Sequence, residues 1–126
     1  MKTTFAYTGI RVKNLEDSVE FYTKILGMKE TGRGAVEATK GEVVSLESEE
    51  GGQQLELNFY KAGSNFAKSY IAGEEMDHLA FKVDDLDKAL REAKDLGYPS
   101  ALEIKSGTSR WAYLKDPNGI FIEILG

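Results

Sequence analysis

The sequence repeats one pattern twice, and this repeat constrains the fold more than any other feature. Residues 7–27 and 78–97 align at an offset of 71, which pairs Val12 with Val83 and Leu15 with Leu86. Each copy opens with a short alternating run and continues with apolar residues at helical spacing as far as a Leu-Gly dipeptide. A unit of about 60 residues cannot bury a sheet face alone, so the two copies are expected to pack together.

Each copy predicts a strand, a helix and three further strands. The opening strands cover residues 7–12 and 78–83, after which Asn14 and Asp85 occupy the N-cap positions of the two helices. Gly-rich segments and an Asp-Pro-Asn-Gly turn separate the remaining strands. These strands are expected at 30–38, 43–48 and 55–60 in the first copy, and at 101–104, 110–114 and 120–125 in the second.

We therefore predict an α+β fold in which two tandem βαβββ modules form a cupped mixed sheet with helices on its outer face. The length is typical of a single domain. Within it we expect module one at 4–60, a linker at 61–75 and module two at 76–126. The linker is predicted to be partly helical over 66–70.

The composition of the chain limits the partners it can bind and the side-chain chemistry available to a functional site. The net charge of -5 would repel nucleic-acid phosphates and anionic lipids, and no basic patch offsets it. No signal peptide or membrane-spanning stretch is evident, so we expect a cytoplasmic protein, with neither nucleic acid nor membrane as partner. With no cysteine, the chemistry of any site falls to oxygen and imidazole groups.

The last strand of each copy contains a carboxylate between two aliphatic residues. Glu56 lies between Leu55 and Leu57, and Glu123 occupies the equivalent position. Alternation directs both carboxylates away from the helices, to the face expected for His78, the only histidine. Taken singly, each of the three is most simply a solvated or structural residue. Their equivalent positions in the repeat favour a divalent metal site, because a cation offsets the repulsion between carboxylates.

The paired modules, the opening at 8–28 and the Asp-Pro-Asn-Gly-Ile-Phe-Ile-Glu ending at 116–123 resemble the vicinal oxygen chelate superfamily, which includes glyoxalases, bleomycin-resistance proteins and extradiol dioxygenases. Glyoxalase I is the most similar branch. The resemblance implies four metal-ligand positions, occupied here by Tyr7, Glu56, His78 and Glu123. Tyr7 departs from the pattern, since glyoxalase I has a histidine there. A phenol binds metal poorly at neutral pH unless the metal itself promotes its ionisation, so the alternative role is a hydrogen bond to substrate or bound water.

The resemblance also implies a reaction. A lactoylglutathione lyase-like metalloenzyme would act on a small-molecule substrate, a thiol hemithioacetal of methylglyoxal or a related 2-oxo substrate, through a metal-stabilised enediolate. Glu123 is the first candidate for the base and Glu56 the second. The ligand set is compatible with nickel, zinc, cobalt, manganese or iron. A homodimer is expected, with sites formed within one chain or across two.

Four more residues are candidates for substrate binding. Arg11 matches an arginine that holds the carboxylate of glutathione, although a surface arginine is the simpler alternative. Tyr60 stands at the spacing of the family's asparagine contact after Glu56, so glutathione specificity does not follow. Trp111 and Tyr113 alternate along one strand and either line a pocket or pack in the core.

Two other functions remain open. A non-catalytic drug-binding protein of the bleomycin-resistance type fits Tyr7 at the first ligand position, and the acidic charge would suit a cationic drug. A ring-cleaving dioxygenase of this superfamily requires two histidines, whereas the chain has one. Retention of Glu56, His78 and Glu123 favours the metal-dependent lyase.

Overall fold

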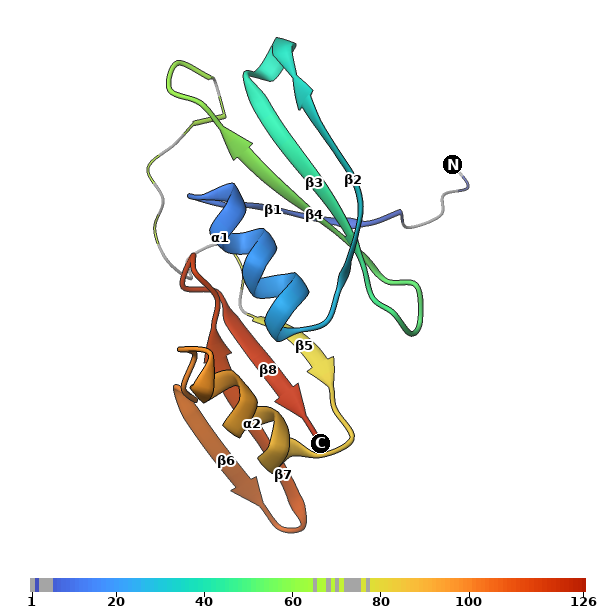
Figure 1. The fold of residues 1–126 in the computed structure, drawn as a ribbon, viewed down its shortest axis with the longest axis vertical. Helices are drawn as coiled ribbons and strands as arrows, with labels where there is room; N and C mark the ends of the chain where they lie inside the picture. Colours follow the sequence, from blue (N-terminus) through green and yellow to red (C-terminus); the bar gives the residue numbers. More distant parts are fainter. Residues whose placement is uncertain are drawn as a thin grey trace. The chain divides into compact units, whose positions relative to one another are not determined.

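Two units with the same order of elements make up the chain, Met1–Tyr70 and Ile71–Gly126 (Figure 1). The computed structural model describes all residues except 1, 3–5, 65, 68, 70, 72–75 and 77. The first unit contains β1 (Thr8–Arg11), α1 (Leu15–Glu20), the π-helix η1 (Phe21–Ile25), β2 (Lys29–Val36), the short 3-10 helix η2 (Glu37–Thr39), β3 (Gly41–Glu47) and β4 (Gln54–Tyr60). The second contains β5 (His78–Lys82), α2 (Leu86–Asp95), β6 (Leu102–Ser106), β7 (Ser109–Lys115) and β8 (Phe121–Leu125).

The two sheets have equivalent strand orders, β1-β4-β3-β2 and β5-β8-β7-β6. In each unit the first strand runs parallel to the last, and the other neighbours are antiparallel. A parallel pair needs a crossover connection, for which α1 with η1 and α2 supply the helices. The order confirms the predicted tandem βαβββ modules, and strand ends differ from the predicted ranges by at most two residues. The predicted helix at 66–70 includes residues 68 and 70, which lie outside the described residues.

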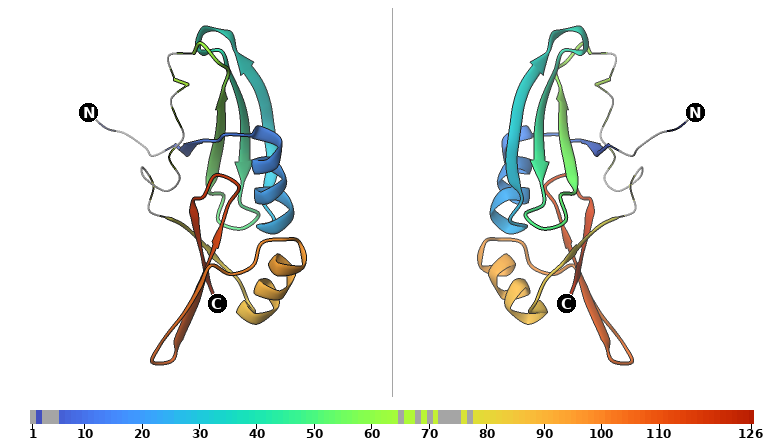
Figure 2. Two further views of the ribbon diagram at one scale, coloured as in Figure 1. Left: turned by 90° about the vertical axis from the view of Figure 1, so that its left-hand side faces the viewer. Right: turned by 90° about the vertical axis from the view of Figure 1, so that its right-hand side faces the viewer.

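One face of each sheet packs against its helix, as the side views in Figure 2 show. Alternate strand positions supply the buried aliphatic side chains of this face. In the first unit these are Ile10, Val44, Leu46, Leu55 and Leu57, joined by Val12 just after β1, and in the second Ala112, Leu114, Ile122 and Ile124. The alternation leaves the opposite face of each sheet for functional side chains. Among the described residues, no helix combines the length and apolar character needed to cross a membrane.

The first helix contains a π turn that the sequence pattern did not predict. After Glu20 the helix widens, and the Leu26 N–H bonds to the Phe21 carbonyl oxygen at 3.3 Å, an i to i+5 contact. The widened segment begins with two consecutive aromatic residues, Phe21 and Tyr22, that are both fully buried. Their rings also meet edge to face at 5.3 Å between centroids, and the burial of both side chains anchors the helix to the core of the first unit.

Both helices begin at the predicted N-caps. The Asn14 side chain accepts a hydrogen bond from the Asp17 N–H at 2.9 Å, and Asp85 accepts one from Lys88 at the same distance. Each bond satisfies a backbone donor that has no partner within the helix.

We expect Asn14→Ala to lower the free energy of unfolding by about 0.5 to 2 kcal/mol, because the Asp17 N–H loses its acceptor. Urea denaturation measures the change. Glu50→Ala, in an exposed turn, is the control and should stay within about 0.5 kcal/mol of the wild type. Equal effects of the two substitutions would contradict the capping role.

Candidate functional site

His78 and Glu123 meet on the open face of the second sheet. Ala80 is the parallel partner of Glu123, so His78, two residues before it, projects from the same face. The His78 Nε2 and Glu123 Oε2 atoms lie 3.2 Å apart, and the two side chains are 36% and 16% exposed. Two donor atoms about 2.1 Å from one metal ion are separated by about 3.0 to 3.4 Å at tetrahedral or octahedral angles. The separation is that of a hydrogen bond or ion pair, and it is also compatible with two ligands of one divalent cation.

Tyr113 completes this cluster from the neighbouring strand. It is the antiparallel partner of Glu123, and its hydroxyl donates a hydrogen bond to Glu123 Oε1 at 3.2 Å. The ring also lies edge to face with His78 and with Phe121, at centroid distances of 6.1 and 6.0 Å. The sequence analysis named Tyr113 as a candidate for substrate binding or core packing but did not reveal its bond to Glu123. The pairing of β7 with β8 is the signal that would have shown it.

Glu56 occupies the equivalent place in the first unit. It is half-buried and lies between Gly9 of β1 and Ser45 of β3 in the strand register. Among the described residues, none forms a hydrogen bond or ion pair with its carboxylate. Tyr7 lies beside the start of β1, and its ring is 4.0 Å from the point where a Cβ on Gly9 would stand. Glu56 and Tyr7 thus share one face of the first sheet.

The predicted ligands are divided between the two units. Glu56 and Tyr7 belong to the first, while His78 and Glu123 belong to the second, where they are in contact. Within either unit, the described residues contain no group of three or more histidine and acidic side chains that could hold a metal ion. Each unit therefore contains part of the predicted ligand set, one carboxylate with a phenol in the first and one carboxylate with an imidazole in the second.

The remaining predicted substrate residues have different surroundings. Arg11, on the open face of the first unit, donates to the Ser69 carbonyl oxygen at 3.5 Å. Tyr60 stacks on Phe66 with ring centroids 5.2 Å apart. Trp111 is half-buried on β7, and its indole N–H is buried with no hydrogen-bond partner among the described residues.

A buried turn fixes the start of β8, the strand that contains Glu123. The Asp116 carboxylate accepts hydrogen bonds from the backbone N–H groups of Asn118 and Ile120 and from the Asn118 side-chain amide, each at 2.8 Å. Asp116 and Asn118 are both buried, and Gly119 supplies a φ of 85°. This turn is a positioning device for Glu123, four residues beyond Gly119.

We expect Asp116→Ala to destabilise the protein by at least about 2 kcal/mol, because three donors lose a buried acceptor. Thermal unfolding of the metal-free protein followed by circular dichroism measures this loss. Asp95→Ala, at the exposed end of α2, serves as the control. A destabilisation no larger than that of the control would show that the turn does not depend on this carboxylate.

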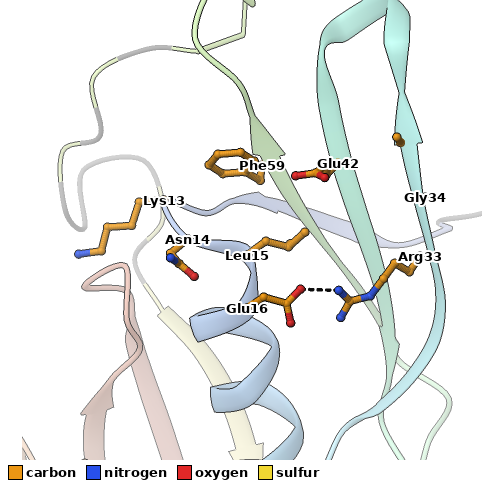
Figure 3. A pocket seen from close by; sticks show the side chains of 9 residues that line it. Lys13, Asn14, Leu15, Glu16, Arg33, Gly34, Glu42 and Phe59 are labelled. Atoms are coloured by element: carbon orange, nitrogen blue, oxygen red, sulfur yellow. Dashed lines mark hydrogen bonds and ion pairs between the residues drawn. The ribbon is translucent and has the colours of Figure 1, made fainter.

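A separate cavity of about 540 Å³ lies on the helix side of the first unit (Figure 3). Phe59 and Glu42 line it from adjacent strands, and Phe59 alternates with Asn58, so the cavity is on the face opposite Glu56. Arg33 at its edge bonds to Glu16 and Glu30, and these hydrogen bonds raise the pKa of the guanidinium. The single positive charge of Arg33 thus faces two carboxylates, and within this group of three one negative charge is left uncompensated.

The fold and the site define a protein of tandem βαβββ modules with acid and imidazole side chains on the open sheet faces. Residues 4–124 match the model of the Glyoxalase/Bleomycin resistance protein/Dioxygenase superfamily, and the chain belongs to this superfamily. The match confirms the resemblance drawn from the opening and ending motifs.

Similar proteins include two curated relatives and one solved structure. A probable lactoylglutathione lyase of Vibrio parahaemolyticus is 30% identical over 125 residues, covering 94% of this chain and 87% of the relative. The lactoylglutathione lyase of Neisseria meningitidis serogroup B is 31% identical, with the same shares covered. The structure of the trypanothione-dependent glyoxalase I of Leishmania major matches with a TM-score of 0.77 and 29% identity, over 99% of this chain and 87% of that one.

Proposed function

We propose that the protein is a metal-dependent lyase of the glyoxalase I type. Its substrate would be a thiol hemithioacetal of methylglyoxal or a related 2-oxo compound. The observation that supports this most directly is the 3.2 Å contact between His78 Nε2 and Glu123 Oε2 on an open sheet face. Relatives named lactoylglutathione lyase at about 30% identity support the same chemistry.

In this proposal Glu56, His78 and Glu123 hold one divalent ion, with contributions from both modules of one chain or of a homodimer. Bound there, the ion would act as a Lewis acid toward two neighbouring oxygens of the substrate. One imidazole and two carboxylates suit nickel, zinc, cobalt, manganese or iron. Tyr7 either takes the remaining ligand position or donates a hydrogen bond to the substrate.

The carboxylates of Glu123 and Glu56 then transfer the proton that the substrate carbon loses. Glu123 takes it from the carbon that bears the substrate hydroxyl, and a proton is returned to the neighbouring carbon, so the product is an isomer of the substrate. Glu56 is the second acid-base group of the site. Tyr113, which pairs with Glu123, and Trp111, two residues earlier on the same strand, would contact the substrate in the second unit, as Arg11 and Tyr60 would in the first. The Arg11 guanidinium suits a carboxylate on the thiol cosubstrate.

We expect the wild-type protein to bind one divalent ion per site, and His78→Ala to lose this binding because the only imidazole is removed. Isothermal titration with zinc or nickel, together with elemental analysis of the purified protein, measures the binding. Glu103→Gln, an exposed strand residue of the same unit, is the control and should bind as the wild type does. Unchanged metal content in His78→Ala would refute the ligand assignment.

The metal-loaded protein should convert the hemithioacetal of methylglyoxal to a thioester, with glutathione or another thiol as the cosubstrate. Ultraviolet absorbance of the thioester measures the reaction. Glu123→Gln should lower kcat by about 100-fold or more while the protein stays folded, since an amide cannot accept the proton. Glu103→Gln again serves as the control.

A binding function of the bleomycin-resistance type is the second candidate, and Tyr7 in place of the first histidine favours it. Absence of turnover with several thiols and metals would support this candidate over the lyase.

A further inference from the structure

We infer that Tyr113 is a positioning residue for Glu123, holding one carboxylate oxygen so that the other is presented to the cation and the substrate. This inference rests on the proposed function, because it assigns a role within the same site. The Tyr113 hydroxyl would then orient the Glu123 carboxylate, a role separate from any contact between the Tyr113 ring and the substrate.

The two oxygens of Glu123 have different partners. The Tyr113 hydroxyl donates to Oε1 at 3.2 Å, while Oε2 lies 3.2 Å from His78 Nε2. The terminal torsion of a glutamate side chain is broad, so an unanchored carboxylate samples many orientations. A hydrogen bond on one oxygen restricts that rotation and leaves the second oxygen directed toward the imidazole.

The Tyr113 hydroxyl is itself held in place. Antiparallel pairing puts Tyr113 directly across from Glu123 on the same sheet face. Its ring contacts two other rings edge to face, that of His78 at an interplanar angle of 82° and that of Phe121 at 79°. These edge contacts limit the motion of a side chain that has only two rotatable torsions, so the hydroxyl is rigid enough to orient a carboxylate.

The first unit lacks this arrangement. Ser45 faces Glu56 across the strand pair as Tyr113 faces Glu123, and the Glu56 carboxylate has no hydrogen-bond or ion-pair partner among the described residues. The two glutamates therefore differ in how firmly they are held. Ser45 also provides a matched control, because it occupies the equivalent register position without contacting a carboxylate.

We expect Tyr113→Phe to weaken binding of zinc or nickel by about 10- to 100-fold, the usual effect of removing an outer partner of a metal ligand. Isothermal titration measures the affinity. Ser45→Ala should bind the metal as the wild type does. In turnover of the hemithioacetal, Tyr113→Phe should lower kcat more than it changes KM, because the ring that borders the substrate is kept. A metal affinity within about two-fold of the Ser45→Ala value would overturn the inference.

A second measurement separates this inference from the proposed function. If the wild-type protein binds no metal, the proposed function fails, but the positioning contact can still be tested in the metal-free protein. Carbon-13 NMR of the Glu123 carboxyl group should then show a shifted resonance in Tyr113→Phe and an unshifted one in Ser45→Ala. An unshifted resonance in Tyr113→Phe would contradict the inference, whatever the outcome of the metal titration.

Discussion

The parallel pairing of the first and last strands in each module is the constraint on which the site depends. It sets Gly9 beside Glu56 and Ala80 beside Glu123, so each carboxylate has a small neighbour on the adjacent strand. A slip of one residue would turn both glutamates toward the helices. There an ionised carboxylate would be buried among aliphatic side chains without a partner, at a large cost in free energy. The register that builds the core therefore also fixes the open faces.

The two modules share a backbone plan but differ in the side chains at equivalent positions. Where the second module has His78 and Tyr113, the first has Tyr7 and Ser45. The first thus has no imidazole near its carboxylate and no phenol across the strand pair. The second module accordingly has the better-organised half of the proposed site. The Glu123 carboxylate of the second module contacts Tyr113 and His78, whereas the Glu56 carboxylate of the first is available to solvent or to a bound cation.

Much of the fold followed from the sequence because strand alternation and helix caps are local. The repeat gave the element order, and period-two alternation assigned Glu56 and Glu123 to the faces opposite the helices. The bond between Tyr113 and Glu123 could not be obtained in this way, since it depends on the antiparallel register that the turn at 116–119 sets. The π turn after Glu20 was likewise missed, because no local pattern distinguishes it from a regular helix. Side-chain periodicity also predicts which face of a sheet a residue lies on, but it does not predict the distance between residues on two different sheets.

Trp111 is the only tryptophan of the chain, and its indole lies in the second unit with the N–H withdrawn from solvent. Its intrinsic fluorescence is therefore an optical reporter of that unit alone, whereas far-ultraviolet circular dichroism averages over both sheets. An emission midpoint that differs from the dichroism midpoint would reveal two modules that melt separately. Coincident midpoints would describe a single cooperative transition across the whole chain.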